Sequence, residues 1–122
     1  MGKNCDRSGP IGPVVPAAEV GDLRDGLLVE TRVNGELVQH GRSDEMLFDV
    51  GGTLSLISHT FTLRPGDLLA TGTPSGVGYS RTPPWLMRPG DVVEVSVEKL
   101  GKITNPIMSN DARRELANRS SI

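Results

Sequence analysis

Leu28-Val29-Glu30-Thr31-Arg32-Val33-Asn34-Gly35-Glu36-Leu37-Val38-Gln39-His40 is the stretch of this 122-residue chain that decides its fold. An Asn-Gly pair between two alternating apolar and polar runs is a strong signal for a β-hairpin, because both residues adopt a positive φ readily. We therefore predict strands over 28–33 and 36–40, joined by a two-residue turn. In these strands Glu30, Arg32 and Gln39 fit the face that meets water.

Two further turns are predicted by a repeated motif. Arg64-Pro65-Gly66-Asp67 and Arg88-Pro89-Gly90-Asp91 both place Pro and then Gly at the central positions, as a type II turn requires. We expect each turn to lead into a strand, the first over 67–71 and the second over 91–98. A last strand is expected over 102–105. The repeat therefore indicates two turns and not two domains.

The rest of the chain predicts little helix. Leu54, Ile57 and Ser58 have helical spacing in a segment over 52–60, and Ser43-Asp44 can cap it. The opening up to Gly26 is rich in Gly, Pro and Asp and lacks an apolar period, which predicts an extended loop over a sheet. A short helix fits 110–116, and 118–122 is typical of a disordered end. Strand-like runs dominate, which favours the α+β class.

Composition argues against several classes of function. A net charge of −2 without any basic block argues against a nucleic-acid or membrane-surface role. No apolar stretch approaches the roughly 20 residues of a membrane helix, and the start lacks a signal-peptide core. We therefore expect a cytoplasmic protein. One cysteine, Cys5, cannot form an internal disulfide. Few aromatic residues predict a thin core and burial by a partner chain; they are Phe48, Phe61, Tyr79 and Trp85.

The first candidate site is the glycine-rich loop Ala70-Thr71-Gly72-Thr73-Pro74-Ser75-Gly76-Val77-Gly78. Its glycines let the backbone bend sharply and turn several N–H groups toward one point, as an anion site requires. The loop matches neither Gly-x-x-x-x-Gly-Lys-Ser/Thr nor Gly-x-Gly-x-x-Gly, so we do not expect a nucleotide. The alternative is a tight turn in which Thr73 caps its own backbone.

Taken together and in order, several segments resemble the C-terminal part of the catalytic domain of the fumarylacetoacetate hydrolase family. The resemblance runs from about Lys3 to Ile107. It implies an α+β fold, a mixed β-roll or sandwich with one short helix, truncated relative to the family domain. It also implies a partial family domain over 1–108 and a polar tail over 109–122. The segments are Gly2-Lys3-Asn4-Cys5-Asp6, Gly9-Pro10-Ile11-Gly12-Pro13, the two Arg-Pro-Gly-Asp turns, the glycine-rich loop, and Leu100-Gly101-Lys102-Ile103-Thr104-Asn105-Pro106-Ile107.

The resemblance implies roles for three residues. Lys3 matches a catalytic lysine whose ammonium stabilises an enolate or a tetrahedral oxyanion of metal-bound substrate. Gly72 and Thr73 match positions that hold a substrate carboxylate or keto-acid oxygen. Four weaker candidates are more typical of surface or turn residues: Asp6, His40, His59 and Asp67. Cys5 is more typical of a small apolar side chain than of a nucleophile.

The resemblance also implies a divalent cofactor, Mg²⁺ or Mn²⁺, held in the complete family domain by a Glu-x-Glu pair and an Asp. Those carboxylates precede the lysine segment and do not occur in these 122 residues. Glu94 and Glu98 belong instead to the family's terminal strand. Because Mg²⁺ needs carboxylate ligands, we expect this chain alone to bind no metal ion tightly.

Three functions remain open. The chain can be a piece of an enzyme for metal-dependent C–C hydrolysis, isomerisation or decarboxylation of 2-oxo or β-diketo acids, inactive alone. It can be a non-catalytic truncated module that keeps a carboxylate-binding loop. It can also be one half of a complementing pair. The expected partners are a small carboxylate or 2-oxo acid, and either a second copy of the chain or a complementing N-terminal half.

Overall fold

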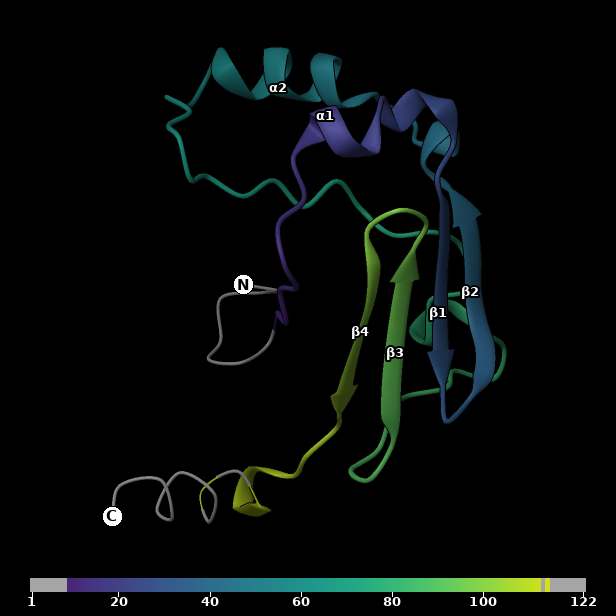
Figure 1. The fold of residues 1–122 in the computed structure, drawn as a ribbon. Helices are drawn as coiled ribbons and strands as arrows, with labels where there is room; N and C mark the ends of the chain where they lie inside the picture. The colour runs from purple at the N-terminus through teal and green to yellow at the C-terminus, as the bar shows by residue number, and fades with distance from the viewer. Residues whose placement is uncertain (1–8, 113, 115–122) are drawn as a thin grey trace.

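A computed structural model describes residues 9–112 and 114 of the chain. It contains one four-stranded sheet of β1 (Leu28–Val33), β2 (Glu36–Arg42), β3 (Val92–Val97) and β4 (Gly101–Pro106). The strands lie in the order β2-β1-β3-β4, and each neighbouring pair is antiparallel (Figure 1). Together with a few short helices, this sheet confirms the predicted α+β class.

The β1–β2 hairpin forms where the Asn-Gly pair predicts it. Asn34 and Gly35 have φ values of 52° and 85°, so both central residues take the positive φ of a type I′ turn. Pairing then runs from Val33 opposite Glu36, with a bulge in the ladder between Thr31 and Arg32. The strands predicted at 91–98 and 102–105 are confirmed as β3 and β4, each within one residue at either end.

The sheet has one apolar and one polar face. Along β1 and β3 the apolar positions are in register, with Val29 opposite Val97 and Val33 opposite Val93. The other face carries charged pairs such as Lys102 Nζ with Glu94 Oε2 at 2.9 Å. Helices α1 and α2 lie beyond one end of the sheet, so neither of them covers its apolar face (Figure 1).

The core is thin, as the composition predicts. Among the described residues only Val20, Leu27 and Val33 are buried apolar side chains. Large apolar residues elsewhere are strongly exposed, including Leu47 at 89% and Leu68 at 73%. A domain of this size that buries so little apolar surface has little hydrophobic stabilisation of its own.

The helices differ in part from the sequence predictions. Helix α2 (Val50–Ser58) confirms the predicted helix but starts two residues earlier, and its cap is Asp49, whose Oδ1 accepts the Gly52 N–H at 2.6 Å. Ser43 instead lies in the short 3-10 turn Ser43–Glu45, where its Oγ accepts the Leu27 N–H at 2.7 Å. The opening segment is also not wholly extended: it contains helix α1 (Ala17–Val20) and a 3-10 turn, Leu23–Asp25.

The strand predicted over 67–71 was wrong. These residues have no regular secondary structure, and Leu68 is largely exposed. The apolar pair Leu68-Leu69 suits a strand, but a strand also needs a neighbour for its backbone hydrogen bonds. In the described part of the chain nothing pairs with this segment.

Candidate functional site

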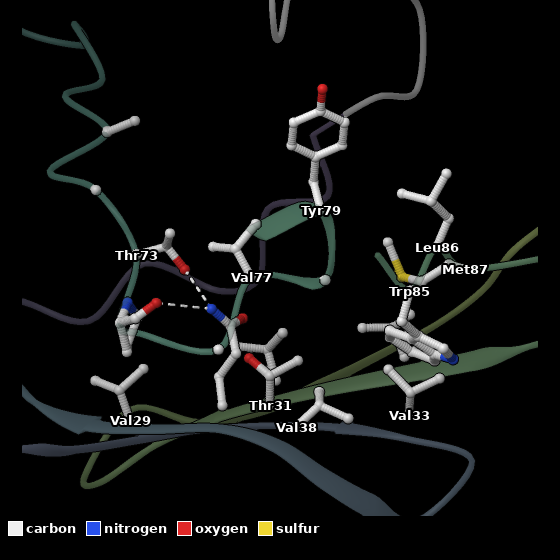
Figure 2. Close-up of a pocket in the computed structure, with 18 residues that line it drawn as sticks. Val29, Thr31, Val33, Val38, Thr73, Val77, Tyr79, Trp85, Leu86 and Met87 are labelled. Carbon is white, nitrogen blue, oxygen red and sulfur yellow. Dashed lines mark hydrogen bonds between the residues drawn. The ribbon is translucent and has the colours of Figure 1, made fainter. Parts of the chain in front are cut away.

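The glycine-rich loop lies directly against β2. The Gln39 side-chain amide bridges the two, because Nε2 donates to Thr73 Oγ1 at 2.9 Å and to the Pro74 carbonyl at 2.9 Å (Figure 2). Gly41 and Gly76 allow the close approach. A Cβ on Gly41 would lie 2.9 Å from Pro74 Cβ, and one on Gly76 would collide with the Val38 carbonyl. Gly76 also has a φ of 97°, which favours glycine.

A β-bulge brings Gln39 to this position. The ladder pairs Arg32 with Leu37 but Thr31 with Gln39, so Val38 is an extra residue on β2. One extra residue reverses the alternation beyond it. Gln39 is therefore half-buried on the same face as Thr31, and the prediction that it lies on the water-facing side was wrong.

Arg81 forms a second link between the loop and β2. Its Nη2 donates to the Val38 carbonyl at 2.7 Å, and its Nε and Nη2 donate to the Gly76 carbonyl at 3.2 and 3.1 Å. The guanidinium also lies over the Trp85 ring, 5.6 Å from its centroid. These contacts satisfy two carbonyls and fix the end of the loop that follows Thr73.

A pocket of about 840 Å³ lies between the loop and the sheet and is open to solvent on one side. Its floor is the apolar face of the sheet, and its far wall is formed by Trp85, Leu86 and Met87 (Figure 2). Few polar side-chain groups line it: the amide of Gln39, the hydroxyls of Thr31 and Thr73, and the indole N–H of Trp85. Tyr79 also lines the pocket, but its hydroxyl points away from the sheet (Figure 2). An apolar cavity with a small number of polar groups is the usual form of a small-molecule site.

Gly72 and Thr73, the predicted binding residues, line this pocket. Gly72 has a φ of 113°, and a Cβ added there would have no atom within 4 Å, so the space beside it is open. Thr73 is exposed, and its hydroxyl accepts the bond from Gln39. This bond to a distant strand takes the place of the local backbone cap that the sequence left as the alternative.

The weaker candidates take structural roles. Asp67 Oδ2 accepts the Arg64 N–H at 2.8 Å and closes its own turn. His59 follows the end of α2, with Nδ1 2.7 Å from the Ser55 carbonyl. His40 is exposed on β2 opposite Glu30. As the sequence suggests, these are turn and surface residues.

Two carboxyl groups have lowered pKa values, and both belong to turns. The Asp22 pKa falls from 3.8 to about 2, chiefly through the hydrogen bonds from the Arg24 side chain. The Asp91 pKa is lowered first by the Arg88 backbone N–H and then by the Asn34 side chain. Neither carboxyl lines the pocket.

The described residues do not fit a divalent metal ion. Within residues 9–112 and 114 there is no group of three or more His, Cys, Asp or Glu side chains that could hold one. Glu94 pairs with Lys102, and Glu98 Oε2 accepts the Leu28 N–H at 3.1 Å. Lys3, the predicted catalytic residue, lies outside the described residues, as do Cys5, Asp6 and the end of the chain from 115.

No helix in the described part of the chain is long and apolar enough to span a bilayer.

Gln39 and Arg81 hold the loop on the sheet, and the sequence revealed neither of these roles. Each binds a segment far along the chain, since Gln39 and Thr73 are 34 positions apart and Arg81 and Val38 are 43 apart. A local pattern carries no signal for such a contact.

Known proteins resemble the chain both in sequence and in structure. Residues 1–108 match the family described as fumarylacetoacetate (FAA) hydrolase C-terminal. An oxaloacetate tautomerase of Bacillus subtilis is 41% identical over 107 residues, which are 88% of this chain and 36% of the relative. A mitochondrial oxaloacetate tautomerase of Xenopus laevis is 39% identical over 108 residues, 88% of this chain and 34% of the relative.

Two solved structures extend the likeness to the fold. Fumarylacetoacetate hydrolase from Exiguobacterium antarcticum has a TM-score of 0.82 at 44% identity, covering 89% of this chain and 39% of its own. Fumarylpyruvate hydrolase from Pseudomonas aeruginosa, solved in complex with Mn²⁺ and pyruvate, has a TM-score of 0.76 at 36% identity, covering 85% and 41%. The chain spans little more than a third of the length of the curated relatives it matches. It belongs to the fumarylacetoacetate hydrolase family, whose C-terminal domain it matches.

Proposed function

We propose that this chain supplies the carboxylate-binding loop of a fumarylacetoacetate-hydrolase-like enzyme that acts on 2-oxo acids. The observation that carries the proposal is the position of Thr73: its hydroxyl lies at an open pocket and is held there by Gln39. The relatives point to the same ligand class. Oxaloacetate and fumarylpyruvate, named in two of them, are both 2-oxo acids, and one related structure contains pyruvate.

The chemistry assigned to the loop is anion binding. A carboxylate or keto oxygen beside Gly72 would accept hydrogen bonds from the Thr73 hydroxyl and from backbone N–H groups of the loop. Bonds to a charged acceptor are worth about 1.5–3 kcal/mol each. We assign to Lys3 the stabilisation of negative charge on the same ligand, as an enolate or an oxyanion.

The catalytic step needs more than the described residues provide. The family's divalent ion finds no ligand group among them. We therefore propose that the metal ligands belong to another part of the family domain, and that this chain alone is inactive. The loop binds the acid group, which substrates of hydrolysis, isomerisation and decarboxylation have in common.

A second candidate function is that of a binding module or a complementing half. The observation that favours it is the incomplete covering of the apolar face of the sheet, where the side chains of Val93, Val95 and Ile103 are only partly buried. In this reading, residues 1–108 form the family unit and associate with a second copy or with an N-terminal half. Catalytic activity that appears only after that half is added would identify a complementing pair.

The test of the binding proposal is a chemical-shift titration of the whole chain with pyruvate and with oxalate. Shifts that centre on Gly72 and Thr73, and that weaken in Thr73→Val, are expected. His40→Ala and His59→Ala serve as controls, because both side chains are exposed and lie outside the pocket lining. Lys3→Ala should weaken binding in the same way only if the N-terminal segment folds back over the loop. Equal responses in all variants, or shifts around the histidines, would disprove the assignment.

A further inference from the structure

The two hydrogen bonds of Gln39 fix which way its side-chain amide points. The Pro74 carbonyl can only accept a hydrogen bond, so the Gln39 atom 2.9 Å from it has to be the NH₂ group. The same nitrogen lies 2.9 Å from Thr73 Oγ1. An amide nitrogen only donates, and it has two hydrogens for these two acceptors. Thr73 therefore receives a hydrogen bond from Gln39 and does not give one.

This arrangement determines what the Thr73 hydroxyl can offer to a ligand. A hydroxyl has one hydrogen and two lone pairs, and Gln39 occupies a lone pair. Among the described residues no acceptor takes the hydroxyl hydrogen. The hydroxyl can therefore donate its hydrogen to a ligand in the pocket that Thr73 lines, and an anionic oxygen needs such a donor.

We propose that Gln39 is the positioning residue of the carboxylate site: it holds the loop through Pro74 and orients the Thr73 hydroxyl as a donor. The inference rests on the proposed function of the loop. Gln39 itself need not touch the ligand, because it acts through Thr73. The β-bulge at Val38 is necessary for this role, because without the extra residue the Gln39 side chain would lie on the opposite face of the sheet.

The first test is a double-mutant cycle on pyruvate affinity, measured by chemical-shift titration of the full chain. Gln39→Leu removes both donors at similar volume and should weaken pyruvate binding about five- to tenfold. Thr73→Val should have a similar effect. Because Gln39 orients Thr73, the loss of affinity in the double variant should be clearly smaller than the sum of the two single losses; what Gln39→Leu still costs in the Thr73→Val background measures the bond to Pro74. His40→Ala, a neighbour on β2 outside the pocket lining, is the matched control.

A second test separates orientation from mere support of the loop. Gln39→Glu is nearly the same shape, but its carboxylate cannot donate and would take the Thr73 hydrogen for itself. On acidification toward its pKa of about 4.3 the new group gains a proton and can donate again. Relative to the unmodified chain, pyruvate affinity of Gln39→Glu should therefore recover severalfold between pH 7 and pH 4. Pyruvate remains an anion there, because pyruvic acid is the stronger acid.

The possible outcomes distinguish a failure of the positioning role of Gln39 from a failure of the proposed carboxylate-binding function. If the unmodified chain shows no pyruvate-dependent shifts at the loop, the proposed function fails. If it binds pyruvate but Gln39→Leu binds equally well, the positioning role fails alone. Additive losses in the cycle, or a Gln39→Glu variant without the pH-dependent recovery, would likewise overturn it. The Trp85 indole signal shows in each variant whether the loop keeps its environment.

Discussion

Asn34 and Asp91, 57 positions apart, join the hairpin turn to the start of β3: Asn34 Nδ2 donates to Asp91 Oδ1 at 2.9 Å. Asn34 Oδ1 also accepts the Val92 N–H at 2.9 Å, and the Asn34 backbone N–H donates to the Val92 carbonyl. Asn34 therefore serves two purposes. It tolerates the positive φ of the turn, and its side chain connects β1 to the second Arg-Pro-Gly-Asp turn.

Asn34→Gly separates these two purposes. Glycine keeps the positive φ at no steric cost but removes both side-chain hydrogen bonds. We expect a lower urea midpoint with an unchanged denaturant slope, because the fold stays the same while a link between distant segments is lost. Gly35→Ala tests the backbone requirement instead, since its φ of 85° is strained for alanine. An unchanged midpoint in Asn34→Gly would show that the link contributes nothing.

The hydrogen bond between Asn34 and Asp91 also makes the stability of the folded chain depend on pH in a defined direction. Because Arg88 and Asn34 lower the Asp91 pKa in the folded chain below 3.8, the folded state binds this proton less readily than the unfolded state does. The stabilisation is therefore complete above pH 3.8 and is lost as the pH falls through the folded value. NMR titration of the carboxyl should give a higher pKa in Asn34→Gly, though still a lowered one, since the Arg88 N–H remains. An identical Asp91 pKa in the unmodified chain and in Asn34→Gly would show that the Asn34 side chain does not lower it.

The two glycines of the loop should differ in their tolerance of alanine. Gly72 has open space beside it, so Gly72→Ala meets only the strain of its positive φ, about 1–3 kcal/mol. Gly76→Ala adds a collision with the Val38 carbonyl to a similar strain and should separate the loop from β2. Thermal unfolding and the amide shifts of β2 measure both effects. Equal destabilisation by the two variants would contradict the observed contact.

Turn and strand chemistry explains how much of this fold the sequence can predict. Asn34-Gly35 and both Arg-Pro-Gly-Asp turns behave as predicted, with Gly66 and Gly90 at φ values of 96° and 99°. Each is specified by residues that adjoin one another. The strand at 67–71 fails for the opposite reason: whether it forms depends on a partner strand, and propensity does not identify one.

The site is predictable only in part for the same physical reason. Gly72 and Thr73 carry the family pattern, and both line the pocket. The residue that orients Thr73 does not belong to any local motif. A bulge of one residue decides the face on which Gln39 lies, and strict alternation cannot anticipate a bulge.

Arg81 offers a direct probe of the loop because it lies over Trp85, the single tryptophan of the chain. Arg81→Lys keeps the charge but replaces a planar group of five donors with one ammonium, which cannot reach both the Val38 and Gly76 carbonyls. We expect a loss of about 1–2 kcal/mol from the hydrogen bonds and the cation–π contact together. Trp85 fluorescence should shift to the red as the loop loosens. Unchanged fluorescence and stability would show that the contacts do not restrain the loop.

The exposed apolar face of the sheet should make the chain associate in solution. Val95 and Ile103 are direct partners on β3 and β4 and line a second hollow together with Pro13. Burying such surface contributes roughly 25 cal/mol per Å², and the few buried side chains leave much of it available. Sedimentation should therefore find dimers or larger species. A double substitution of Val95→Thr with Ile103→Thr should reduce association, whereas Ser96→Thr on the polar face should not. A monomer that melts sharply and cooperatively would contradict this expectation, because it would show that the thin core suffices without a partner.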